Sequence, residues 1–145
     1  GAIIAETSQE NADLIYDFGL NLGLAFQLQD DYLDAFGDPE TFGKQVGGDI
    51  IENKKTFLYL KAVAFSKEEE AQELRRLFAI HPEDNSAKIK TVKELFNSSG
   101  AAKATQEAIH DFTFLAFQTL DKMKISAEKK EMLRNFGENL MGRKV

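Results

Sequence analysis

The sequence lacks cysteine altogether and contains only two prolines in 145 residues. Without cysteine there is no disulfide framework and no thiolate metal site, which fits a reducing compartment. No apolar run approaches the roughly 20 residues that a helix needs to cross a bilayer. No charged segment followed by an apolar segment opens the chain, as a secretion signal would. We therefore expect a cytoplasmic protein without a membrane span.

The charge balance also excludes one class of partner. Eighteen lysines and arginines stand against 24 aspartates and glutamates, which gives a net charge of −6. No basic stripe is present to meet a phosphate backbone, so we expect no nucleic-acid partner. Hydrophobic residues make up 43% of the chain, which is enough for the core of a single globular domain.

Long periodic segments with few breakers indicate an all-α protein, a helical bundle of about six helices that forms one unit over residues 1–145. Thr7 and Glu10 fit a capping box that opens the first helix, and Ser66 fits a second one. Ser126 fits the cap of the last helix, and Gly100 fits a C-terminal stop. The predicted helices cover approximately 8–36, 53–65, 66–80, 87–98, 101–123 and a last segment after 126.

The first predicted helix is too apolar between residues 18 and 28 for a surface helix, so we expect it to be buried on all sides. Gly19 and Gly23 lie four residues apart, on one side of this helix. Because glycine has no side chain, we expect another backbone or a ligand to come close to them.

An acidic cluster follows this apolar segment. Asp30 and Asp34 lie one turn apart on the helix, with Gln27 one turn earlier and Asp31 at the edge of the same face. Crowded carboxylates repel one another unless water or a cation lies between them. Oxygen ligands without cysteine or histidine suit Mg²⁺, which typically takes one or two carboxylates and completes its shell with water and phosphate.

The next segment supplies positive charge. Residues 37–48 contain four glycines and Pro39, which predicts a loop. Lys44 lies in this loop, and Lys54 and Lys55 are expected to open the following helix. Ammonium groups bind phosphate as point charges, and a helix N-terminus adds backbone N–H donors. Carboxylates and lysines this close in sequence indicate a clamp for a metal and a diphosphate.

Two other interpretations of the acidic cluster come from the pattern itself. Three aspartates at a helix end are usually solvated surface, and the three lysines alone would usually be ordinary surface charges. An EF-hand is a poor fit, because "DDYLDAFGDPET" lacks the alternating ligands and a glutamate at its twelfth position.

The segments "GLAFQLQDDYLD" and "GDPETFGKQVGGDIIENKKTFL" resemble the second aspartate-rich region of the trans-polyprenyl diphosphate synthases, the farnesyl and geranylgeranyl diphosphate synthases and their longer-chain relatives. The resemblance is dense over residues 15–62 and weaker to the C-terminus. The matching positions are Phe26, Gln27, Asp30, Asp31, Asp34, Gly43, Lys44, Gly48, Asp49, Lys54 and Thr56.

The resemblance implies a Mg²⁺-dependent prenyltransferase of isoprenoid biosynthesis, which joins isopentenyl diphosphate head-to-tail to an allylic diphosphate. It implies that Asp30 and Asp34 hold a metal and that Asp31 contributes directly or through water. Lys44 and Lys54 would bind the allylic diphosphate and act in catalysis. Gln27 would lie beside the allylic chain, next to Phe26, and stabilise developing positive charge.

The sequence also departs from this family. Family enzymes are much longer and carry a first aspartate-rich motif, whereas the only DDxxD here spans residues 30–34. The chain therefore resembles the C-terminal half of a synthase, which we expect to be inactive alone and homodimeric when complete. A terpene cyclase relative and a non-catalytic helical interaction module are the alternatives. The product length and the allylic primer cannot be read from the sequence.

Overall fold

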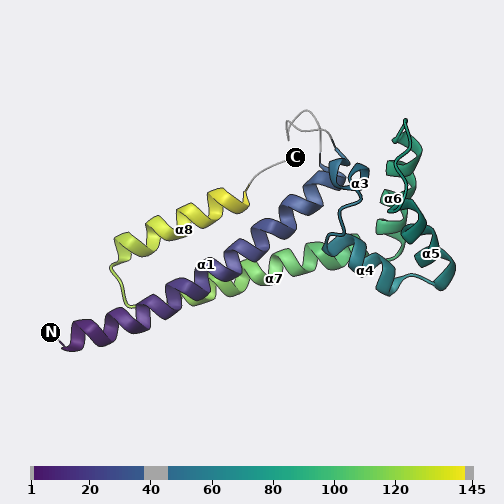
Figure 1. The fold of residues 1–145 in the computed structure, drawn as a ribbon. Coiled ribbons are helices and arrows are strands. Elements are labelled where there is room, and N and C mark those ends of the chain that lie inside the picture. The colour runs from purple at the N-terminus through teal and green to yellow at the C-terminus, as the bar shows by residue number, and fades with distance from the viewer. Residues whose placement is uncertain (1, 38–45, 143–145) are drawn as a thin grey trace. The chain divides into compact units, whose positions relative to one another are not determined.

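The computed structural model describes residues 2–37 and 46–142, and side chains from residue 9 onward. These ranges form helices and no strand, which confirms the predicted all-α class (Figure 1). None of the helices in the described ranges is long and apolar enough to cross a membrane. The helices are α1 (Ala2–Phe36), α3 (Gly48–Ile51), α4 (Phe57–Phe65), α5 (Glu68–Leu77), α6 (Ser86–Ser98), α7 (Ala101–Lys122) and α8 (Ala127–Met141).

The chain divides into two compact units. Unit 1 contains the described residues 2–27 and 108–142, and unit 2 contains 28–37 and 46–107.

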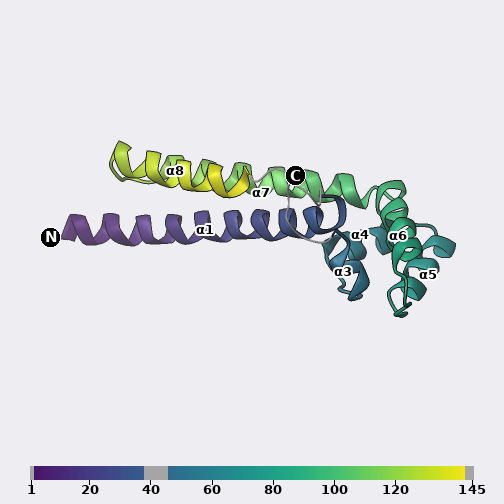
Figure 2. The ribbon, with the colours of Figure 1, turned by 90° about the horizontal axis from the view of Figure 1, so that it is seen from above.

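In unit 1, the first part of α1 packs against α7 and α8 (Figure 2). The ring centroids of Phe18 and Phe117 lie 6.2 Å apart, and the side chain of Asn11 exchanges hydrogen bonds with the backbone of Lys124. The core of unit 1 consists of Phe18, Leu22, Ala116, Leu120 and Met123.

Unit 2 forms its own core around a series of aromatic rings. Tyr59 and Phe78 have ring centroids 4.4 Å apart, and Phe96 lies 6.4 Å from Phe78 and 6.5 Å from Phe36. Burial of an aromatic or leucine side chain contributes about 1.5–3 kcal/mol each, so this cluster fixes α4, α5 and α6 around the end of α1. The fully buried members include Ile50, Leu58, Leu74, Val92 and Phe96.

Several predicted helix boundaries are confirmed. Helix α6 begins and ends within one residue of the expected range. Ser126 caps α8, because its Oγ accepts a hydrogen bond of 3.2 Å from the backbone N–H of Lys129. Gly100 lies in the left-handed region with φ 91°, which is where the chain turns from α6 into α7.

Other boundaries are wrong. Helix α1 begins at Ala2, so Thr7 lies inside a helix and does not cap it. Ser66 ends α4 and does not cap α5, which begins at Glu68 after Lys67 and ends at Leu77, three residues earlier than expected. Helix α1 continues through Thr7, and a capping pattern alone does not fix where a helix begins.

The start of α4 is also corrected. It begins at Phe57, so Lys54 and Lys55 lie in the turn before it and do not form its first turn. The physical reason is local: Asn53 has φ 59° and Thr56 is extended, and neither conformation continues a helix. The short helix α3 was not predicted from the sequence, because the glycines before it indicated a loop. With α3, the described residues contain one helix more than the expected six or so.

The expectation that the first helix is buried on all sides is wrong for this chain. Tyr16, Leu20 and Leu24 recur every four residues on one face of α1 and are 68%, 49% and 39% exposed. A Cβ atom added at Gly19 or Gly23 would meet no other atom of the described residues within 4 Å. Phe18, Leu22 and Ala25 form the buried face. Between residues 15 and 27, the helices of the described ranges therefore cover only one side of α1.

Candidate functional site

The acidic cluster lies where α1 ends, in unit 2. Asp31 is buried, at 8% exposure, whereas Asp30 and Asp34 are half-buried. Because residues one apart point about 100° away from each other on a helix, Asp30 and Asp31 face different surroundings. The three aspartates therefore lie at a partly buried helix end, and the alternative of a fully solvated surface does not describe Asp31.

Asp34 connects the end of α1 to α3. Its Oδ2 accepts a hydrogen bond of 2.8 Å from the backbone N–H of Asp49, and its carbonyl oxygen accepts one of 2.6 Å from Gly47. A carboxylate satisfies unpaired N–H groups in the first turn of a helix, so Asp34 stabilises α3. A Cβ at Gly48 would lie 3.3 Å from Asp34 Oδ1, so this close approach favours glycine there.

Gly47 is the second position of this segment that favours glycine, here because of its backbone conformation. Its φ of 92° lies in the left-handed region, and a Cβ there would lie 2.9 Å from Ile89 Cδ1 on α6. The turn before α3 thus packs directly onto α6. This contact, together with the bond from Asp34, fixes α3 between the end of α1 and α6.

Lys54 brings positive charge to the acidic cluster. Its Nζ lies 3.7 Å from Oδ1 of Asp31. The lysine side chain is 55% exposed and the aspartate side chain 9% exposed, so the pair joins an exposed cation to a largely buried anion. Lys55, by contrast, extends over the ring of Tyr59, with its Nζ 5.8 Å from the ring centroid. The structure therefore brings one of the two predicted lysines of this turn to the aspartates.

The electrostatic surroundings of Asp31 oppose its negative charge. Burial raises the pKa of the Asp31 carboxyl above its usual value, and repulsion by Asp49 and Asp30 raises it further. Attraction to Lys54 lowers this pKa without cancelling the effect of burial. A cation bound beside Asp31 would relieve the same repulsion, so the surroundings fit a metal ion as well as a lysine.

The described residues contain no group of three or more acidic or histidine side chains that could hold a metal ion by themselves. Mg²⁺ does not require such a group, since it usually keeps several waters and takes one or two carboxylates together with phosphate oxygens. The donor set of Asp30, Asp31 and Asp34 therefore fits a Mg²⁺ ion that arrives with a phosphate-bearing ligand. That these residues bind metal stays a prediction.

The remaining predicted site residues have different outcomes. Lys44, with Gly43, lies outside the described residues. Gln27 is exposed on α1 and Phe26 is half-buried, both within unit 1. Gln27 belongs to the segment 18–28 that we expected to be buried on all sides, and this expectation is wrong for Gln27, because the described residues do not cover that face of α1.

Sequence reasoning gave no site role to Asp49 and Asn53. Asp49 was recognised only as a matching position, yet its backbone bonds Asp34 and its charge acts on Asp31. The position of Asn53 after a short apolar segment could have indicated the end of a helix, because asparagine tolerates the left-handed conformation found there. Neither role is visible without the fold of residues 46–56.

Comparison with known proteins supports a relationship over most of the chain. The family model for polyprenyl synthetase matches residues 1–96. A short chain isoprenyl diphosphate synthase of Methanothermobacter thermautotrophicus is 31% identical over 132 residues, which is 91% of this chain and 40% of that protein.

Two solved structures agree. A geranylgeranyl pyrophosphate synthase is 53% identical with a TM-score of 0.82, over 93% of this chain and 42% of that one. A geranylgeranyl pyrophosphate synthase from Corynebacterium glutamicum, complexed with isoprenyl diphosphate and magnesium, is 30% identical with a TM-score of 0.81, over 91% and 37%. The chain thus spans about two fifths of the length of the relatives it matches. On the extent of the family match, the chain belongs to the polyprenyl synthetase family.

Proposed function

We propose that the protein carrying this chain is a Mg²⁺-dependent trans-prenyltransferase that makes polyprenyl diphosphates. It joins isopentenyl diphosphate head-to-tail to an allylic diphosphate. The observation that carries the proposal is the pairing of Lys54 with the buried Asp31, beside Asp34 and the start of α3. A site with adjacent carboxylates and an exposed ammonium group suits a ligand that brings both a metal ion and phosphate oxygens.

The charged residues have complementary roles in this proposal. Asp30, Asp31 and Asp34 hold Mg²⁺, which supplies positive charge to the diphosphate leaving group. Lys54 and Lys44 hold the diphosphate itself. Without ligand, Lys54 partly offsets the charge of Asp31. When the ligand binds, Lys54 turns to a phosphate oxygen, which its exposed side chain can do at little cost.

The reaction then follows from charge separation. The bond between the allylic carbon and the diphosphate oxygen breaks, and its electron pair leaves with the diphosphate. The double bond of isopentenyl diphosphate attacks the cationic carbon, and a proton is lost to form the new double bond. Lys54 and Lys44 stabilise the negative charge that develops on the diphosphate. Gln27 orients its amide oxygen toward the cationic carbons, and Phe26 contacts the allylic chain.

This activity is proposed for the complete protein. The chain covers about 40% of the related synthase from M. thermautotrophicus, and the residues that bind isopentenyl diphosphate and a facing aspartate-rich motif are expected outside it. We further propose that the complete protein is a homodimer and acts in the cytoplasm.

The experiment uses the full-length protein with labelled isopentenyl diphosphate and an allylic diphosphate, with Mg²⁺ or with a chelator. We expect an elongated diphosphate product only with Mg²⁺. Asp31→Asn and Lys54→Ala should lower kcat about 10²–10³-fold, as for the loss of a group that stabilises developing charge. The matched control is Lys55→Ala, whose side chain lies over Tyr59 and whose loss should leave the rate within about twofold.

Different outcomes would support the alternatives. A cyclised product without diphosphate would favour a terpene cyclase. A protein that shows no Mg²⁺-dependent binding of pyrophosphate in calorimetry would be a non-catalytic helical module, and the proposal would be abandoned. If Lys54→Ala has the same rate as the unmodified enzyme, Lys54 does not take part in the site.

A further inference from the structure

A buried lysine lies on α6, on the side that faces the turn carrying Lys54. Lys88 is only 3% exposed, and lysine is almost never this buried unless its ammonium group has partners. Its hydrogen-bond acceptors are neutral: Nζ donates to Oδ1 of Asn53 and, at 2.8 Å, to the carbonyl oxygen of Ile80. Burial lowers the pKa of the Lys88 ammonium group. Burying an ammonium group costs free energy, so we expect Lys88 to have a role beyond filling space.

The two partners of Lys88 also contact each other. Nδ2 of Asn53 donates to the carbonyl oxygen of Ile80 at 3.2 Å, and it lies 3.4 Å from Nε2 of His81. Lys88, Asn53 and the Ile80 carbonyl therefore form a closed triangle of hydrogen bonds. This triangle joins α6, the segment that follows α5 and the turn after α3 within unit 2.

Asn53 is the residue that sets the direction of this turn. Its φ of 59° is the only positive φ of a non-glycine residue in the part of the chain that the structure describes. Its backbone N–H donates to Ile50 at 3.1 Å, and the next N–H, that of Lys54, donates to Asp49 at 2.9 Å. Since a non-glycine residue in this conformation is held by its surroundings, the bonds of the Asn53 side chain help to maintain it.

We propose that Lys88 is a positioning residue that acts through Asn53 to fix the turn from which Lys54 reaches the diphosphate site. The inference rests on the proposed function, because it gives Lys88 a role toward the ligand of that site. Lys88 lies one residue before Ile89, which packs against Gly47 before α3. Two successive residues of α6 thus support the two ends of the segment 47–54, which carries both Asp49 and Lys54.

A charged donor suits this role better than a neutral one. Hydrogen bonds from an ionised donor are shorter and roughly twice as strong as those between neutral groups. An ammonium group can also donate to two acceptors from different segments at once.

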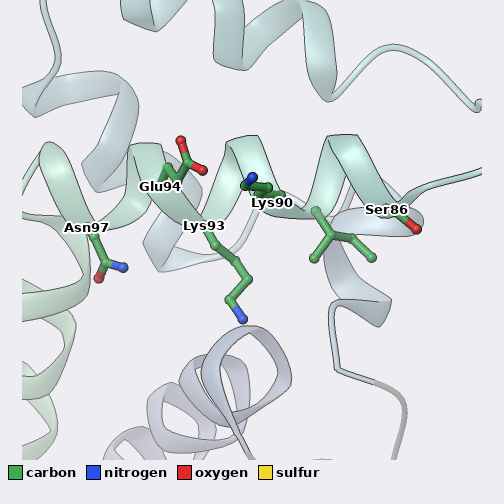
Figure 3. A pocket seen from close by; sticks show the side chains of 6 residues that line it. Ser86, Lys90, Lys93, Glu94 and Asn97 are labelled. Atoms are coloured by element: carbon green, nitrogen blue, oxygen red, sulfur yellow. The ribbon is translucent and has the colours of Figure 1, made fainter.

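Lys90 and Lys93 on the same helix differ from Lys88, because they line an open pocket together with Ser86, Glu94 and Asn97 (Figure 3).

The test measures the binding of Mg²⁺-pyrophosphate to the full-length protein by calorimetry in a double-mutant cycle. Lys54→Ala should weaken binding, and Lys88→Met should weaken it by roughly three- to tenfold, as expected for the loss of a hydrogen bond from a charged group. If Lys88 acts through Lys54, the double variant should bind no more weakly than Lys54→Ala alone. A purely structural role predicts losses that add instead.

A second variant and a control keep the result interpretable if Lys88→Met does not fold. Asn53→Gly removes the side-chain bonds but permits the same positive φ, and it should weaken pyrophosphate binding to a similar extent. Hydrogen exchange at the amides of residues 54–56 should become faster in both variants, with the cores of α5 and α6 unchanged. Lys90→Met, an exposed lysine of α6, should leave both measurements unchanged.

The outcomes separate the two levels of the proposal. If Lys54→Ala weakens binding while Asn53→Gly or a folded Lys88→Met binds as the unmodified protein does, the positioning role is wrong and the diphosphate site remains. Additive losses in the double variant would also overturn the positioning role. If Lys54→Ala itself has no effect, the proposed diphosphate site fails, and the role of Lys88 fails with it.

Discussion

The Nζ atom of Lys54 lies 3.7 Å from Oδ1 of Asp31, and this distance joins an exposed cation to a buried carboxylate. An exposed lysine leaves such a pair easily, because ion pairs with a solvated partner contribute only about 0–1 kcal/mol. Asp31 cannot leave, since its side chain is buried at the end of α1. The relationship is therefore asymmetric: the anion is held in place and its counter-ion can be exchanged.

Stability should depend on pH through Asp31. Burial and neighbouring carboxylates raise the pKa of the Asp31 carboxyl above its usual value of 3.8. The folded chain thus holds this proton more tightly than the unfolded chain, and the contribution of Asp31 to stability is lost as pH rises through its raised pKa. Asp31→Asn cannot titrate, so its free energy of unfolding relative to the unmodified chain should increase from pH 3 to neutral pH.

The measurement is urea unfolding of both chains over this pH range, with the difference between them removing the titration of all other groups. Lys54→Met is the matched comparison, because Lys54 is the group that lowers the pKa of Asp31. Its loss should raise that pKa further and make the pH dependence steeper. A constant difference between Asp31→Asn and the unmodified chain would contradict this prediction.

Gly47 should be less tolerant of substitution than Gly100, although both have a positive φ. Alanine at either position costs about 1–2 kcal/mol of backbone strain. At Gly47 the added Cβ would also lie 2.9 Å from Ile89 Cδ1, whereas at Gly100 no described atom lies within 4 Å. In thermal unfolding, Gly47→Ala should therefore lower the stability of unit 2 more than Gly100→Ala does. Equal losses would mean that Ile89 moves aside without cost.

Sequence periodicity predicted the helices of this chain better than their ends. The predicted range of α6 is correct because its apolar stripe ends just before two serines and Gly100, which end the helix. Thr7 and Ser66 both fit a capping pattern, yet α1 continues through Thr7 and Ser66 ends a helix. A capping pattern is a local preference of a few tenths to about 2 kcal/mol, which tertiary packing readily overrides.

The candidate site shows the same limit. The spacing of Asp30, Asp31 and Asp34 predicted their place on one helix end, because helical periodicity alone fixes it. The positions of Lys54 and Lys55 were misjudged, because they depend on the left-handed Asn53. The side chain of Asn53 accepts a hydrogen bond from Lys88, which lies 35 residues further on. No local pattern contains such a contact.

Ser126 and Ser66 offer a direct comparison of a true cap with an apparent one. Ser126 Oγ accepts a hydrogen bond from the N–H of Lys129, so Ser126→Ala should cost about 1 kcal/mol. Ser66 Oγ is buried and has no hydrogen-bond partner among the described residues. Replacing it with alanine removes a buried, unsatisfied hydroxyl, so Ser66→Ala should be neutral or stabilising. Chemical unfolding of the two variants checks both; a large loss for Ser66→Ala would reveal a cap that the structure does not contain.

The 145-residue chain by itself should not carry out prenyl transfer. The acidic face of α1 is one side of a cavity in the proposed function, and the exposed Tyr16, Leu20 and Leu24 show that the described residues leave another part of this helix uncovered. A carbocation formed without an enclosing cavity would be captured by water.

We expect no elongated product from the purified chain with Mg²⁺, isopentenyl diphosphate and an allylic diphosphate, under conditions in which the full-length protein is active. Adding the rest of the proposed full-length protein as a separate chain should restore activity, and Lys54→Ala in the shorter chain should abolish that restoration. Elongated product from the 145-residue chain alone would show that these helices already enclose the reaction.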